Sequence, residues 1–333
     1  MDPRSTLPPG PSRPARAWRR LLAAAAAAAL VVTATACSDG DDATAGGEAG
    51  GTDSQSQLEP AVEVDPGPAP TVELLDAGSG ERRVLTYAPS REPEVVAVTR
   101  SGSARTSVPG SAPRTDRTPA QTLTVEGRSE PDVDGAQRAT VTARGFTSVD
   151  ELRAAQFATA AGFTVTWTRS ADGIVRGLSL EAPADATDAA RAGVEIMADA
   201  VADATVAWPS EAIGIGARWS VTRTIDDAVA PTRVVTYQLA ALDGDEATVR
   251  MTTGAPGTAD TLTAPGPDGG PGVTLDVVAF DVAGSGELTV DLRAALPVGG
   301  MTESSTRAVY VDPVSGRRTT YDEDSVLEFR RAG

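Results

Sequence analysis

Apolar and polar side chains alternate over much of the chain after Thr71. Between Phe163 and Trp167, for example, the apolar side chains are separated by Thr. Such alternation is typical of antiparallel strands that bury one face and expose the other. It recurs at 122–125, 237–241, 249–251, 273–277 and 288–292. The Ser-, Thr- and Pro-rich segment 101–119 lacks the pattern and is predicted to be a long loop. We predict a mainly β domain over 71–333, with a curved antiparallel sheet that forms a half-barrel or a sandwich.

Two segments interrupt the alternation with helical patterns. Ser148 to Glu151 has the form of a capping box, which predicts a short helix that ends near Gly162. A longer helix is predicted over 185–205. Its apolar stripe consists of Ala190, Val194, Met197 and Val201. We expect the long helix to pack against the sheet; the alternative is that it forms a lid over a cavity.

A faint internal repeat points to two related halves. Residues 78–86 and 214–222 share two Gly, one Arg and one Thr at matching positions. This pattern predicts two half-sheets, 71–182 and 208–333, which the helix at 185–205 would join.

The first 36 residues have the layout of a secretory signal. An Arg- and Pro-rich start leads into an apolar run over 21–32, and small residues follow up to Ala36. The run is shorter than the roughly 20 residues that a membrane-spanning helix needs. We therefore predict a signal peptide over 1–36 that directs the chain out of the cytoplasm.

Residues 34–37, Ala-Thr-Ala-Cys, resemble the lipobox of bacterial lipoproteins, in which small residues precede a cysteine. That family usually has Leu at the position of Ala34. The resemblance implies cleavage before Cys37 and a diacylglyceryl group on its sulfur, which would anchor the chain to the outer face of the cytoplasmic membrane. Two acyl chains hold a protein stably, whereas one does not. Arg19 and Arg20 leave two export routes open, the general secretory and the twin-arginine route.

The stretch from Ser38 to Pro70 is rich in Gly, Ser, Asp and Glu and has few apolar residues. A segment of this composition cannot bury enough apolar surface to fold. We therefore predict an acidic, disordered tether over 37–70 that separates the anchor from the β domain.

Composition narrows the classes of function. The formal net charge is −17, and the chain contains no His and no Lys. An acidic surface repels nucleic acid, so no nucleic-acid partner is expected. The missing residue types exclude imidazole bases, His-containing triads and lysine Schiff bases. Since Cys37 is the only cysteine, an intrachain disulfide and a thiolate metal cage are excluded as well. We expect no enzymatic activity, no cofactor and no metal.

Three segments in the second half carry a family resemblance. They are a Pro- and Gly-containing turn with a Trp-bearing strand at 208–221, a Gly-x-Gly strand and turn at 284–300, and a strand–turn–strand at 310–321. In this order they resemble an uncharacterised family of secreted, β-rich bacterial proteins. More remotely, the layout is similar to the lipoprotein-carrier class, in which a curved antiparallel sheet and helices enclose an acyl-chain cavity. The resemblance implies a fold and brings no catalytic residues with it.

The candidate binding residues are large and apolar: Trp167, Met197, Val201, Trp208 and Trp219. They are expected to line a cavity between the long helix and the sheet, and the alternative is that they are ordinary core residues. The favoured hypothesis is a lipid-anchored, non-catalytic envelope lipoprotein that binds an apolar ligand or an envelope protein.

Two other functions stay open. One is a carboxylate-based hydrolase, which needs two acidic side chains that converge in a cleft. Its candidate acids are Asp276, Asp281, Glu287 and Asp291. The other is a purely structural or spacer domain, which predicts neither a cavity nor a cleft.

Overall fold

The computed structural model describes residues 57–225, 227–264 and 272–332. The predicted signal peptide, Cys37 and most of the predicted tether lie outside these residues. The described part is mainly β, with one long and one short α-helix. This confirms the predicted fold class, a curved antiparallel sheet with two helices.

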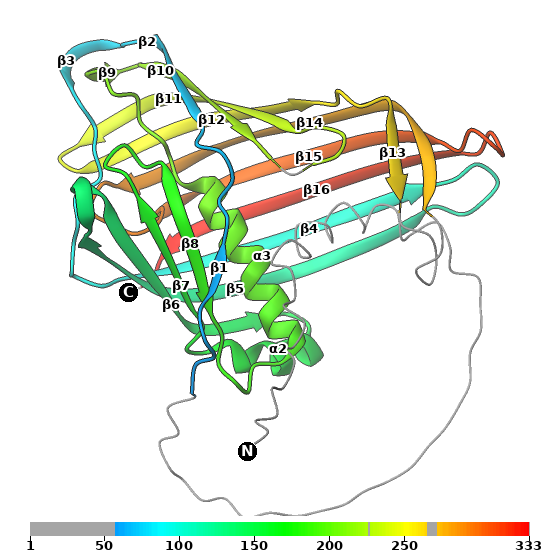
Figure 1. Cartoon of the computed structure of the whole chain (residues 1–333), viewed down its shortest axis with the longest axis horizontal. Coiled ribbons are helices and arrows are strands. Elements are labelled where there is room, and N and C mark those ends of the chain that lie inside the picture. The colour runs from blue at the N-terminus through cyan, green and yellow to red at the C-terminus, as the bar shows by residue number, and fades with distance from the viewer. Residues whose placement is uncertain (1–56, 226, 265–271, 333) are drawn as a thin grey trace, which may run out of the picture.

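Fourteen strands form one antiparallel sheet, which is open and curves around a trough (Figure 1). The strands of its first meander are β4 (Glu94–Ser107), β5 (Arg114–Pro131), β6 (Gln137–Ser148), β7 (Thr164–Arg169) and β8 (Val175–Glu181). Those of the second are β10 (Arg218–Thr224), β11 (Thr232–Asp243), β12 (Glu246–Pro256), β14 (Val273–Asp291), β15 (Gly299–Val311) and β16 (Arg318–Arg331), with β13 (Thr261–Ala264) paired to β14. The two meanders become one sheet where β4 pairs with β16.

The chain before β4 contributes strands to both edges of the sheet. β1 (Val62–Val64) pairs with β8, and β2 (Thr71–Asp76) pairs with β10 at the opposite edge. β3 (Ser79–Arg83) pairs with β9 (Ile213–Ile215) in a separate two-stranded sheet. The expected half 71–182 therefore needs correction, because β2 and β3 pair with strands of the second half.

The two copies of the faint repeat lie against each other. The backbone N–H of Gly214 donates to the carbonyl of Ala77 at 2.9 Å. A Cβ on Gly214 would lie only 2.3 Å from the carbonyl oxygen of Ser79. Glycine at 214 is thus required by the close approach of the two backbones.

The predicted bounds of the tether, 37–70, include residues that belong to the ordered β domain. β1 places Val62 opposite Leu180 and Val64 opposite Leu178, and Val64 is buried in the core. Val62 is 53% exposed, so β1 is held by the burial of Val64 and by backbone pairing with the edge of β8. The part of 37–70 that contains β1 is therefore ordered, and the prediction of disorder is wrong there.

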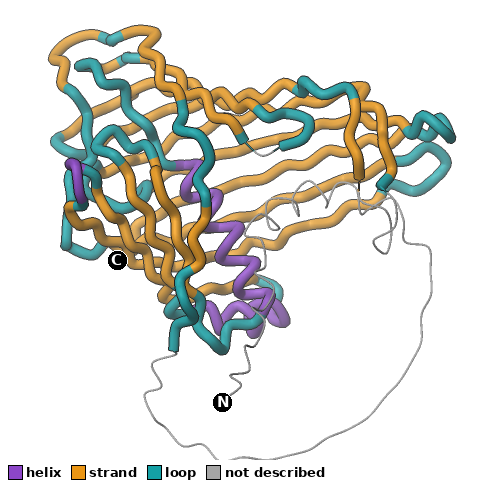
Figure 2. Tube along the Cα trace, in the orientation of Figure 1, coloured by secondary structure: helices purple, strands orange, loops and turns teal. Residues whose placement is uncertain are grey.

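Both helices begin at a side-chain cap. In α2 (Glu151–Phe157) the cap is the carboxylate of Asp150, which accepts from the N–H groups of Leu152 and Arg153, so Ser148 is not the N-cap. In α3 (Asp188–Ala204) the hydroxyl of Thr187 accepts from the N–H of Ala190. α3 runs through the trough (Figures 1 and 2). Two short 3₁₀ turns complete the helical segments, η1 (Val133–Gly135) and η2 (Ala158–Ala160).

Several strands continue well past α3 as a single layer (Figure 2). The expected loop 101–119 is instead mostly strand, because it forms the paired ends of β4 and β5, with Ser103 opposite Arg117. Side chains here are polar on both faces and partly or fully exposed. The strands therefore form without the apolar alternation that reveals a half-buried strand, since backbone pairing with long neighbours holds them.

Arg169 is fully buried at the core end of β7. Its guanidinium donates to the carbonyls of Ala294 at 2.7 Å and Ala295 at 3.1 Å, and to the side-chain oxygen of Gln137. It also lies 3.7 Å from the centre of the Tyr87 ring. Burial lowers the pKa of Arg169 to about 10, so the group is still charged at neutral pH. Arg169 thus connects β6, β7, the segment after β14 and the chain before β4.

An aromatic stack fills the part of the core beneath β10 and β11. Ring centres of Trp208 and Trp219 are 5.4 Å apart, and those of Trp219 and Tyr237 are 5.5 Å apart. The indole N–H of Trp219 donates to the carbonyl of Ala207 at 2.8 Å. Tyr87 extends the stack toward Arg169, with its ring 6.3 Å from that of Trp208.

We predict that the tyrosines ionise well above their usual pH. Burial raises the pKa of Tyr237 and of Tyr310 to about 12, and it also raises the pKa of Tyr87 and Tyr321. The unfolded chain releases these protons near pH 10, so stability that is fully present below pH 10 is lost as the pH rises toward 12. Tyrosinate absorbance measured against pH should rise later in the native protein than in urea. A native midpoint near pH 10 would contradict this burial.

Candidate functional site

A small apolar cavity lies between α3 and the trough of the sheet. Its volume is ≈ 20 Å³. The wall consists of Val98, Leu123, Val125, Val141, Ala143, Phe163, Val165 and Trp167 from β4 to β7 and the residue before β7, of Val194, Met197, Ala198 and Val201 from α3, and of Leu296. This is the region between the long helix and the sheet in which a cavity was expected.

The pairing register of β4 to β7 explains which strand residues line the cavity. Val98 lies directly opposite Leu123, and Val141 lies directly opposite Val165. Directly opposed residues of antiparallel strands share a face, so every second residue of β4 to β7 points into the trough. Trp167, two residues after Val165, belongs to this same face. On α3, wall residues recur at helical spacing, which turns one stripe of the helix toward the strands.

The five predicted binding residues divide into two groups. Trp167, Met197 and Val201 line the cavity. Trp208 and Trp219 do not: they belong to the aromatic stack beneath β10 and β11. Sequence reasoning missed Leu296, which lies between β14 and β15 in a segment without an alternating pattern.

The cavity is small and its wall is apolar. A space of ≈ 20 Å³ accommodates about one water molecule. An apolar wall offers water few partners, and such cavities stay dry. A ligand larger than water can occupy this position only if α3 moves away from the strands.

Ion pairs hold both ends of α3. Near its start, the guanidinium of Arg191 donates to both carboxylate oxygens of Glu59 at 2.8 and 2.9 Å. These hydrogen bonds hold the pKa of Glu59 below its usual range and raise that of Arg191. Near its end, Asp203 binds Arg233 at 2.6 Å. All of these side chains reach solvent, where ion pairs contribute little to stability. The buried apolar stripe of α3 therefore holds the helix in the trough, and the ion pairs at its ends add little.

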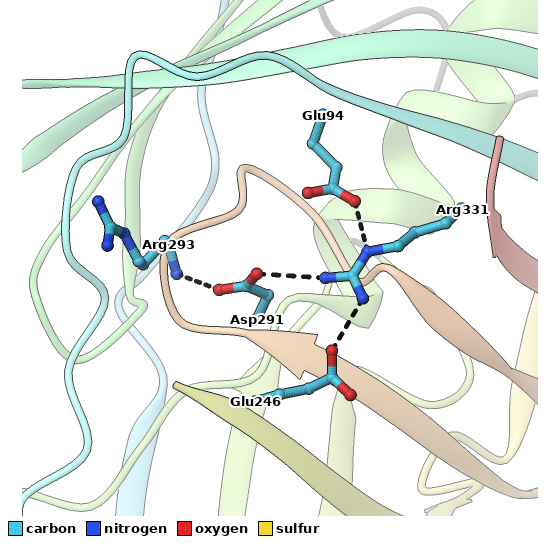
Figure 3. Close-up of polar contacts among 5 residues, drawn as sticks. All are labelled: Glu94, Glu246, Asp291, Arg293 and Arg331. Carbon is cyan, nitrogen blue, oxygen red and sulfur yellow. Dashed lines mark hydrogen bonds and ion pairs between the residues drawn. The ribbon is translucent and has the colours of Figure 1, made fainter. Parts of the chain in front are cut away.

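A different polar cluster gathers around Arg331 at the end of β16 (Figure 3). Its guanidinium donates to Glu94 at 2.6 Å, to Glu246 at 2.9 Å and to Asp291 at 3.2 Å. Asp291 also accepts from the backbone N–H of Arg293. The hydrogen bonds that Arg331 donates to Glu94 and Glu246 raise its pKa. One cation thus joins β4, β12, β14 and β16 by binding three carboxylates.

The acids considered for a hydrolase are spread along one strand. Asp276, Asp281, Glu287 and Asp291 all belong to β14. Since a strand advances about 3.4 Å per residue, the two acids nearest in sequence, Glu287 and Asp291, are roughly 13 Å apart along it. Glu287 binds Arg250 at 3.0 Å, and Asp291 binds Arg331. The structure therefore brings none of these four together as a close pair.

A wider, open groove of ≈ 530 Å³ lies over β14, β15 and β16. Glu287, Met301 and Glu328 lie opposite one another on these strands, on the face away from the core, and Glu303 also lines the groove. Its mixed, acidic wall contrasts with the apolar wall of the cavity. Among the residues that the structure describes, no group of three acidic or cysteine side chains is arranged to hold a metal ion.

Comparison with protein-family models and with curated proteins finds no match for this chain. The resemblance of 208–321 to a secreted β-rich family, and that of 34–37 to a lipobox, therefore stay predictions. Within the described ranges, none of the helices combines the length and the apolar character that crossing a membrane requires.

We predict that Arg331→Met lowers the free energy of unfolding by about 1–2 kcal/mol, because it leaves three neighbouring carboxylates without their shared cation. Arg250→Met is the matched control, since it removes one exposed pair with Glu287 and should cost less than about 1 kcal/mol. Urea unfolding of both variants measures the difference. Equal losses would show that the three-carboxylate cluster adds nothing beyond a single surface pair.

Proposed function

We propose that this protein is a lipid-anchored component of the cell envelope whose non-catalytic β domain encloses an apolar ligand between α3 and the sheet. The anchor would be an acylated Cys37 on the outer face of the cytoplasmic membrane. The observation that carries the binding proposal is the continuous apolar wall that α3 shares with β4 to β7.

The arrangement of α3 supports a lid role. Its middle contributes Val194, Met197 and Ala198 to the wall, and Arg191 near its start and Asp203 near its end form ion pairs. A cavity of ≈ 20 Å³ costs on the order of 0.5 kcal/mol when it stays empty. Outward movement of α3 would enlarge it, and an apolar ligand would replace the lost contacts between helix and strands. The ligand's own burial then stabilises the open arrangement.

Filling the cavity tests this proposal. N-phenyl-1-naphthylamine, an uncharged apolar probe, should fluoresce more strongly when mixed with the full chain. Ala198→Leu puts extra carbon atoms into the wall and should weaken probe binding by about tenfold or more. Ala202→Leu is the matched control, because it lies on the same helix but off the cavity wall. The ligand proposal fails if the wild-type chain does not bind the probe, or if both variants bind it as well as wild type does.

The anchor is tested separately. Cys37→Ala in the full chain should move the protein from the membrane fraction to the soluble fraction of a bacterial host and abolish labelling by radioactive palmitate. Ser38→Ala should leave both unchanged. A Cys37→Ala protein that still floats with membranes would overturn the lipid anchor and leave the cavity proposal standing.

A further inference from the structure

Part of β5 forms a free edge of the sheet. β4 pairs with β5 from Arg114 onward, whereas β6 pairs with it only from Gln121 onward. On the side away from β4, residues 114–119 therefore face no strand among the residues that the structure describes, and β5 is the outermost strand of the layer beyond α3 (Figure 1). The side chains of 114–117 are exposed. The N–H and C=O groups of such an edge can pair with a strand of another chain.

The charges on this edge are self-complementary. Arg114 and Asp116 lie two residues apart and therefore on the same face, and the guanidinium already contacts the carboxylate at 3.0 Å. When an edge pairs with a second copy of itself in antiparallel orientation, one residue lies opposite its own equivalent on the two-fold axis. With Thr115 on that axis, Arg114 of each copy lies opposite Asp116 of the other. Opposite charges at directly opposed positions stabilise a pair of strands.

The same side chains disfavour the neighbouring registers. An axis at Asp116 places two carboxylates opposite each other, and an axis at Arg114 or Arg117 places two guanidiniums opposite each other. Pro119 has no N–H and ends the edge that can pair. Charges and proline on an edge usually prevent pairing altogether. Here they leave the register centred on Thr115 open and close those on either side of it.

Exposed apolar side chains lie at the end of the same edge. The N–H of Val149, just before α2, donates to the carbonyl of Ala120 at 3.3 Å, so the start of α2 lies beside this end. Val149 is 76% exposed and Leu152 is 82% exposed. With Thr115 on the axis, Ala120 falls opposite the turn 108–113 of the second copy. That turn carries Val, Ala and two Pro side chains, so it brings apolar surface toward the exposed pair.

We propose that β5 pairs with β5 of a second copy of this chain and forms a two-fold dimer centred on Thr115. The sheet of one copy then continues into the sheet of the other, and the start of α2 packs against the turn 108–113 of the second copy. Since both copies use the same edge, the contact consumes it and closes the assembly as a dimer. This dimer depends neither on the cavity nor on the lipid anchor.

Exchange of charges tests the dimer with the full chain. Arg114→Asp makes both positions acidic and Asp116→Arg makes both basic, so each variant alone should dimerise about tenfold more weakly than wild type. An equal mixture of the two should dimerise as wild type does, because every directly opposed pair is then opposite in sign. The double variant that carries both changes should do so as well. Arg176→Asp, at an exposed position on β8, is the matched control for the change in net charge.

Sedimentation equilibrium measures these dissociation constants. So short an interface is expected to be weak, with a Kd on the order of 10–100 μM, and the measurement therefore extends to roughly 300 μM protein. A wild-type chain that stays monomeric over this range would overturn the dimer. Equal association of wild type and both single variants would overturn it too, because the contact would then lie on another surface.

Cross-linking tests the register. In a Cys37→Ala background, Thr115→Cys puts the only thiol on the axis, where the two Cα atoms would be about 4.5–5.5 Å apart, within the span of a disulfide. Thr118→Cys is the control, since its two equivalents would lie six residues apart, roughly 20 Å along the strand. Mild oxidation with copper phenanthroline should dimerise Thr115→Cys at least about tenfold faster than Thr118→Cys.

Equal oxidation of the two cysteine variants would overturn the pairing centred on Thr115. Probe binding and membrane attachment are measured on other parts of the chain and at other positions. Failure of the dimer therefore leaves the proposed function standing, and failure of the proposed function leaves the dimer standing.

Discussion

The packing of α3 into the trough is the contact on which the rest of the domain depends. An open sheet of this curvature presents a broad apolar face, and the stripe of Ala190, Val194, Met197 and Val201 covers its centre. The close fit requires a glycine: a Cβ on Gly193 would lie 2.5 Å from the ring of Phe146. Where the stripe reaches β4 to β7, the packing leaves the small apolar cavity. The same contact therefore organises the core and forms the candidate site.

Arg169, at the end of β7, links several separate segments of the chain within the core. It binds backbone carbonyls from the second meander and a side chain from β6, and it lies over Tyr87 from the chain that precedes β4. Among the described residues none supplies a carboxylate to it, so its charge is stabilised by carbonyl dipoles and an aromatic face. Breaking such a network leaves buried carbonyls unpaired, which costs more than an exposed ion pair gains. Because its guanidinium is bound to these partners, Arg169 does not line the neighbouring cavity, whose wall carries no charged side chain.

The sheet combines two kinds of strand. Near α3, strands bury one face and carry the alternation of apolar and polar residues. Beyond α3, the same strands continue with polar side chains on both faces, and a small cluster of Leu275, Ala308 and Tyr310 forms a separate apolar contact. Arg331, at the other end of β16, links four strands across the sheet by its three carboxylates. Apolar burial thus defines the domain centre, whereas backbone pairing extends the strands beyond it.

The sequence alone determined the fold class and the long helix, because periods of two and of 3.6 are local properties that burial imposes on each element. The same periods place Trp167 on the buried face of its strand and Met197 and Val201 on the apolar stripe of the helix, where they line the cavity. Only the tertiary structure decided which elements meet: β2 crosses to the second meander, the expected loop 101–119 becomes paired strand, and Trp208 and Trp219 stack away from the cavity. The position of Leu296 on the cavity wall and the partners of Arg169 depend on contacts between residues far apart in the chain, and no local pattern encodes such contacts.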